Sequence, residues 1–178
     1  MPAYVAFLRA INVGGRFIKM ADLRAGLSHQ GFGDVESHIQ SGNLRFTSSL
    51  RSAAKVELAV EAALEDLCGF TVRTIVRTPS KLGQLTSYGA GLKAPMEGDG
   101  RRYVTFLKDD PDDAFLAIMN NWDIDGERAH VRDREVYLWY SHPSHEAKLS
   151  NARIERAGVV ATARAWKVVP PPAGKGGA

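Results

Sequence analysis

Apolar residues follow two patterns along the first half of the chain, a continuous run and a helical repeat. Residues 4–9 form a short apolar run that is typical of a buried strand. A glycine-containing connection follows at residues 10–17. Between residues 20 and 27 the apolar positions recur at helical spacing, and Gly31 ends the helix that they predict.

The next sixty residues complete a recognisable order of elements. Residues 35–40 alternate between apolar and polar side chains, which suits a half-buried strand. Turn residues at 41–43 lead into a partner strand at 44–47. A helix with one apolar face is predicted at 51–68, and a strand at 70–77. The order strand, helix, strand, strand, helix, strand is that of a ferredoxin-like unit.

The second half repeats much of this order without repeating the residues. A short helix is expected to start at residues 78–79, and the four glycines and the proline of residues 88–100 read as a linker. Strands are predicted at 102–107 and in a hairpin of 127–132 and 135–140.

Two more helices are predicted in this half. One carries Phe115, with Asp110 and Pro111 as its cap, and the other covers about residues 151–157. The sequence therefore predicts an α+β fold of two tandem ferredoxin-like subdomains with antiparallel sheets. Their expected ranges are residues 1–90 and 91–169, and residues 170–178 are expected to be a disordered tail.

This topology gathers polar residues of the first subdomain at one edge of its sheet. The first two strands of such a unit run parallel with the third between them, so their C-terminal ends share an edge. The connection at residues 9–15 and the hairpin tip at 40–43 should therefore lie together, and ligands favour strand ends where connections diverge. The residues expected to bind a ligand there are Arg9, Asn12, Gly14, Gly15, Lys19, Gln40, Ser41 and Asn43.

These residue types suit a small anionic or polar ligand. Arg9 and Lys19 would neutralise its charge, and Lys19 lies where a helix begins, with free N–H groups and the positive end of the helix dipole. Gly14 and Gly15 let the backbone approach a ligand or adopt positive φ. The alternative is that both loops are ordinary turns, since phosphate-loop and dinucleotide spacings are absent.

Charge and composition narrow the classes of function. The 178 residues carry a net charge of +3 and one cysteine, so an internal disulfide is excluded and a reducing, cytoplasmic compartment is expected. The short apolar run at the N-terminus contains Arg9 and lacks a preceding basic residue, so it does not resemble a signal peptide, and no segment approaches a membrane span. Residues 1–88 hold ten bases and seven acids, a weak pointer to an anionic partner.

Other chemical groupings are weaker. His142 and His145, with the acids of residues 109–113, do not form a set of convergent metal ligands, so no metal site is expected. Ser41 near His38 lacks a nucleophile elbow and a third member. Cys68 lies on an apolar helix face and reads as a small core residue. No general acid or base stands out, so no reaction and no cofactor are assigned.

Several segments resemble one bacterial family. Residues 4–15, 19–24, 31–32 and 39–44 look like its opening motifs, and residues 150–166 look like its closing motif. The family is catalogued as domain of unknown function 1697. The resemblance implies a two-part fold of ferredoxin-like subdomains and no established activity. Ala163 and Ala165 replace a threonine and an asparagine of the usual closing motif, and the usual Asn-Pro-Phe before the second half is missing.

The closing motif retains Arg164 and Trp166, which would add a guanidinium and a stacking surface to the ligand site if this segment folds back. The alternative is that Trp166 is a hydrophobic anchor. Two other functions stay open. The first is a nucleic-acid-binding module that tracks a backbone through basic residues, because the aromatic motif of RNA-recognition modules is absent. The second is a structural interaction domain.

Overall fold

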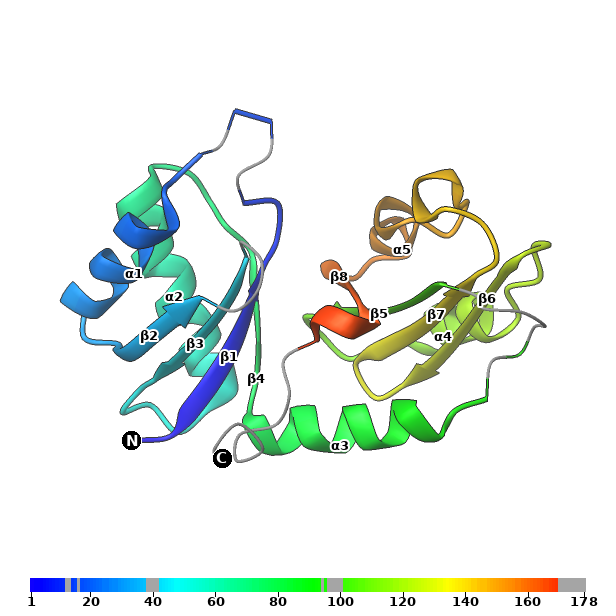
Figure 1. Cartoon of the computed structure of the whole chain (residues 1–178), viewed down its shortest axis with the longest axis horizontal. Helices are drawn as coiled ribbons and strands as arrows, with labels where there is room; N and C mark the ends of the chain where they lie inside the picture. The colour runs from blue at the N-terminus through cyan, green and yellow to red at the C-terminus, as the bar shows by residue number, and fades with distance from the viewer. Residues whose placement is uncertain (12–13, 16, 38–41, 94, 96–100, 170–178) are drawn as a thin grey trace. The chain divides into compact units, whose positions relative to one another are not determined.

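The computed structural model describes residues 1–11, 14–15, 17–37, 42–93, 95 and 101–169 (Figure 1). The chain divides into two compact units, Met1–Gln84 and Leu85–Val169. This division falls inside the helix α3 (Pro79–Gly91), earlier than the boundary after residue 90 expected from the sequence. The expected tail, residues 170–178, lies outside the described residues.

The first unit is a four-stranded antiparallel sheet with two helices (Figure 1). Its strand order is β2-β3-β1-β4, which is the order of a split βαββαβ unit. The elements are β1 (Ala3–Leu8), α1 (Met20–His29), β2 (Gly33–Ser37), β3 (Asn43–Thr47), α2 (Ala53–Cys68) and β4 (Thr74–Arg77).

The second unit repeats this topology, with strand order β6-β7-β5-β8. The α+β fold of two tandem ferredoxin-like subdomains is thereby confirmed. The elements after α3 are β5 (Arg101–Leu107), α4 (Asp113–Asn120), β6 (Glu127–Arg132), β7 (Glu135–Tyr140), η1 (Ser144–Glu146), α5 (Asn151–Arg156), β8 (Ala161–Ala165) and η2 (Trp166–Val168).

The core of the first unit lies between the sheet and its two helices. Tyr4, Ala6 and Leu8 alternate along β1 toward the cluster that contains Leu23 and Leu27 of α1. The period of two in the strand and the helical period in α1 thus bring their apolar faces together. The same alternation carries the side chains of the odd-numbered β1 residues, from Ala3 to Phe7, to the opposite face.

Two glutamates of α2 lie against the open side of β4, the outermost strand of the same sheet. The backbone N–H of Thr74 donates to Glu61 Oε1 and that of Val76 donates to Glu57 Oε1, each at 3.0 Å. β4 is an edge strand of the sheet. Because its N–H groups meet carboxylates, β4 is less able to pair with a strand of another chain.

In the second unit, all six residues of β7 are buried, so both faces of the sheet are covered. Leu138 and Tyr140 belong to the cluster that contains Phe115 of α4 and Ile154 of α5. On the other face, the Tyr137 hydroxyl donates to the Leu85 carbonyl of α3 at 3.1 Å. The second half of α3 is therefore part of this unit.

Some predicted boundaries were wrong. α3 continues to Gly91, so it is not a short helix, and part of the expected linker is helical. β4 begins at Thr74 instead of residue 70. The cap of α4 is Asp112, whose Oδ1 accepts the Phe115 N–H at 2.8 Å, whereas Asp110 pairs with Arg134 at 2.9 Å.

No helix among the described residues is both long enough and apolar enough to cross a membrane.

Candidate functional site

The end of β1 and the start of β3 lie side by side at one edge of the first sheet. Phe7 pairs with Asn43 in the antiparallel ladder, and the Leu8 N–H donates to the Gly42 carbonyl at 2.7 Å. One residue further, the Arg9 N–H donates to the Arg73 carbonyl at 2.9 Å. The connection that leaves β1 therefore starts beside the residues that lead into β3 and β4.

Four basic residues belong to elements that begin or end at this edge. Arg9 follows β1 and is half-buried, Lys19 precedes α1 and is exposed, and Arg73 precedes β4 and is exposed. Arg24 of α1 donates from Nη1 to Ser37 Oγ, the last residue of β2, at 2.6 Å. Arg24 and Arg73 were missed by the sequence reasoning, because Arg24 lies inside the predicted helix and Arg73 lies inside the strand predicted at 70–77.

The glycines of the connection have the backbone freedom that the sequence indicated. Gly14 and Gly15 have φ of +59° and +82°, in the left-handed region that favours glycine. A Cβ built on either residue would meet no atom within 4 Å, so the backbone there faces open space. Lys19 precedes α1 in an extended conformation, and its side chain does not cap the helix.

The remaining predicted residues of this edge divide into two groups. Asn43 is fully buried at the first position of β3 and has no solvent-facing surface for a ligand. Asn12, Gln40 and Ser41 lie outside the described residues, as does His38.

Arg164 and Trp166 belong to the second unit. Arg164 donates from Nη1 to Thr162 Oγ1 at 2.8 Å and to the Ala163 carbonyl at 2.9 Å. Burial lowers the pKa of Arg164 to about 10, because the guanidinium loses hydration. A Cβ on Gly89 would lie 2.4 Å from Trp166 Cη2, so Trp166 packs directly on α3, which fits an anchoring role for it.

Trp166 also contacts a second arginine of the same unit. Arg102 Cζ lies 4.3 Å from the Trp166 ring centroid and 5.6 Å from that of Trp139. Arg102 Nη2 donates to the Gly89 carbonyl of α3. The sequence reasoning missed this arginine, because its two aromatic partners are far away in the chain.

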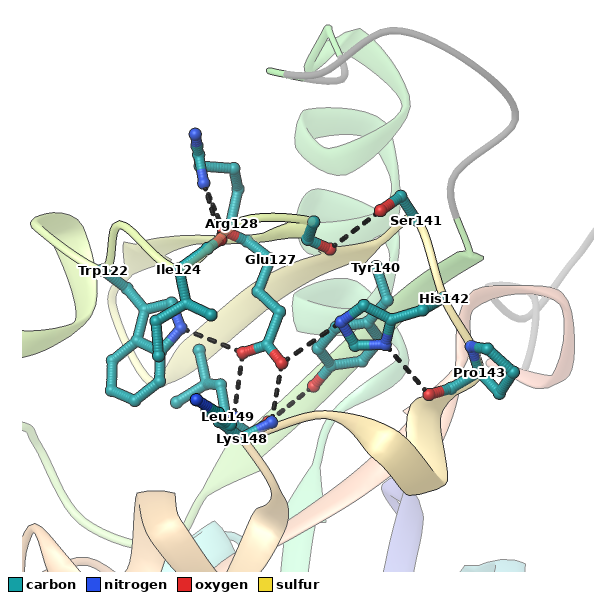
Figure 2. A network of polar contacts seen from close by, with 11 residues as sticks. Trp122, Ile124, Glu127, Arg128, Tyr140, Ser141, His142, Pro143, Lys148 and Leu149 are labelled. Atoms are coloured by element: carbon teal, nitrogen blue, oxygen red, sulfur yellow. Dashed lines mark hydrogen bonds and ion pairs between the residues drawn. The ribbon is translucent and has the colours of Figure 1, made fainter.

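A buried carboxylate, Glu127, joins four segments of the second unit (Figure 2). Its Oε1 accepts the Lys148 N–H at 2.6 Å, and its Oε2 accepts the Leu149 N–H and the Trp122 indole N–H, each at 3.0 Å. His142 Nε2 lies 3.3 Å from Oε1. Glu127 is therefore a structural crosslink between the ends of α4 and β7, the start of β6 and the segment before α5.

His142, His145 and Cys68 offer little for catalysis. The ring of His142 faces Glu127, whereas His145 is largely exposed and lies 3.9 Å from Glu146. Among the described residues there is no group of three or more His, Cys, Asp or Glu side chains that could hold a metal ion. Burial raises the pKa of the Cys68 thiol, and Cys68 packs against the core of the first unit, so a reactive thiolate is disfavoured.

The fold and the site together define a class of protein. It has two tandem ferredoxin-like units, and the first unit has basic residues and an open glycine turn at one sheet edge. The chain belongs to the family described as "Protein of unknown function (DUF1697)", whose model matches residues 1–137. The match ends before the segment 150–166 that resembles the closing motif. No curated protein matches the sequence.

One solved structure is similar over nearly the whole chain. It is described as a conserved bacterial protein, SP0830, from Streptococcus pneumoniae. The two share 24% sequence identity with a TM-score of 0.68, over 93% of each chain. At this identity the likeness supports the fold alone.

Proposed function

We propose that the protein binds a small anionic or polar ligand, a nucleotide or a phosphorylated metabolite, at the edge of the first sheet between the β1–α1 connection and the β2–β3 hairpin. The observation that carries this proposal is the ladder of β1 and β3, which brings the start of one loop within 2.7 Å of the end of the other, from Leu8 N to Gly42 O. Because the two loops meet there, their side chains and backbone can converge on one ligand.

The charges at this edge support an anionic ligand. Arg9 and Lys19 would neutralise it, and Arg24 and Arg73 add positive charge from neighbouring elements. The open backbone at Gly14 and Gly15 would let N–H groups approach it. Asn12, Gln40 and Ser41 would orient it through directional hydrogen bonds. Asn43, which is buried, would support the turn.

A thermal-shift screen of nucleotides, sugar phosphates and inorganic anions tests this function. A ligand of the site should raise the melting temperature, and Arg9→Ala/Lys19→Ala should abolish the rise. The matched control is Arg51→Ala/Lys55→Ala, which removes two exposed charges near the start of α2 and should keep the rise. A screen without any stabilising compound, or an equal loss in the control, would overturn the proposal.

The alternative is a nucleic-acid-binding module. In the second unit Tyr137 and Trp139 are 1% and 3% exposed, so these strand aromatics are not open to stacking with bases. Backbone-tracking through basic residues stays an alternative, and it would show as single-stranded RNA binding that weakens steeply with salt. Absence of binding at low salt would remove it.

The compartment proposed for this function is the cytoplasm. The proposal rests on the single cysteine, because a chain with one cysteine forms no internal disulfide and needs no oxidant to fold.

A further inference from the structure

The start of β5 and the end of β8 line a cavity in the second unit that is open to solvent on one side. Its volume is about 340 Å³, and it is lined by Arg101, Arg102, Tyr103, Ala165, Trp166 and Lys167. Tyr103 pairs with Ala165 at the end of the ladder, so the chain beyond Ala165 continues beside Arg101 and Arg102. This volume lies at the lower end of the range of about 300–1,000 Å³ for small-molecule pockets.

The described residues that line this cavity carry positive charge and no carboxylate. Three of its residues, Arg101, Arg102 and Lys167, are cationic, and none of the six is acidic. Among the described residues, no carboxylate forms a salt bridge with any of the three. Elsewhere in this unit, Arg128 and Arg134 do have aspartate partners.

A cavity in the first unit gives a useful contrast. It has a similar volume of about 370 Å³ and is also lined by strand residues. Its lining contains Asp34 and Glu36 together with Arg45, and Glu36 lies opposite Arg45 in the ladder. Its charges can therefore balance one another, whereas the described residues that line the cavity in the second unit include cations and no acid.

Arg102 is held in place before any ligand arrives. Its guanidinium stacks on Trp166 and donates to the Gly89 carbonyl, so its side chain has little freedom left to lose on binding. Burial lowers the pKa of Arg102 because the cation has lost hydration, and an anion in the cavity would compensate for that loss.

We propose that this cavity is a binding site for a phosphorylated small molecule, distinct in its residues from the edge of the first unit. The phosphate would contact Arg101, Arg102 and Lys167, and the carbon skeleton would lie against the Trp166 ring. The ligand is small because the cavity holds one compact molecule, and anionic because three cations line it without an acid.

Tryptophan emission tests this site separately from the first unit. Trp122, Trp139 and Trp166 all lie in the second unit, and residues 1–84 contain no tryptophan. Titration with AMP should give a saturable change in emission at millimolar concentration or below. Arg9→Ala/Lys19→Ala should keep this change, so a failure of the function proposed above is distinguishable from a failure here.

The decisive variant is Arg101→Ala/Lys167→Ala, because both side chains are exposed and their removal should spare the fold. It should weaken AMP binding at least about tenfold, as expected when charge-assisted contacts are lost. The matched control, Lys148→Ala/Arg156→Ala, removes two exposed charges that do not line the cavity and should bind normally. No saturable change with wild type, or equal weakening in the control, would overturn the proposal.

Discussion

The Glu127 crosslink leads to a quantitative prediction for the variant Glu127→Gln. The substitution keeps the shape of the side chain but replaces one acceptor oxygen by an NH2 group. If the nitrogen takes the place of Oε2, it faces the N–H groups of both Trp122 and Leu149. If it takes the place of Oε1, it faces the Lys148 N–H and the His142 ring.

The second arrangement is the better one, because it leaves one N–H group without an acceptor, whereas the first leaves two. It leaves one part-buried N–H group, that of Lys148, without an acceptor, which costs about 1–3 kcal/mol. Glu127→Ala removes the acceptor of three N–H groups, so the expected cost exceeds about 3 kcal/mol. The order of stability is therefore wild type, then Gln, then Ala.

Urea unfolding followed by tryptophan emission measures this loss in the unit concerned, because all three tryptophans lie there. The matched control is Glu146→Gln, an exposed glutamate of the same unit, which should change the free energy of unfolding by less than about 0.5 kcal/mol. If Glu127→Gln were as stable as wild type, or if the control lost as much, the crosslink would not contribute as argued.

Two further predictions concern the same unit. Burial raises the pKa of Tyr137 and Tyr140 well above the usual value, so their neutral forms favour the folded state below about pH 10, and this stability is lost as the pH rises further. In an alkaline titration, ultraviolet absorbance should show fewer than five ionised tyrosines until the protein unfolds. Above about pH 10, Tyr140→Phe should reduce the loss of unfolding free energy by about 1.4 kcal/mol for each pH unit. Ionisation of all five tyrosines before unfolding would contradict the burial of Tyr137 and Tyr140. The variant Gly89→Ala should lower the melting temperature, because the added methyl would meet Trp166. Gly91→Ala is the control and should not lower it, because a Cβ there has nothing within 4 Å. Equal stability of the two variants would show that Gly89 is not needed for this packing.

The fold of the first unit could be predicted because each element carries its own local signal. The apolar run of β1 and the repeat of Leu23 and Leu27 in α1 both mark buried faces. The strand β8 was not predicted, because Ala161 and Ala165, two of its alternate residues, are small. Its partner strand β5 is also distant in the sequence. α3 was underestimated because Gly89 reads as a linker residue, although it makes room for Trp166.

The candidate site was predictable only in part. Topology alone indicated that the loop after Leu8 and the turn at Gly42 share an edge, and the positive φ of Gly14 suits a glycine turn. The burial of Asn43 could not be foreseen, because a polar residue after a turn usually faces solvent. Glu127 was missed for a related reason: a glutamate at a strand start reads as exposed, and its donors come from distant segments.

The binding of an anion at the edge of the first sheet is tested most directly by an amide NMR titration with a phosphorylated ligand from the thermal-shift screen. The account predicts saturable shifts of the Arg9, Gly14 and Gly15 amides, at a concentration that rises in Arg9→Ala/Lys19→Ala. Amides of this edge that do not move, while those elsewhere do, would contradict it.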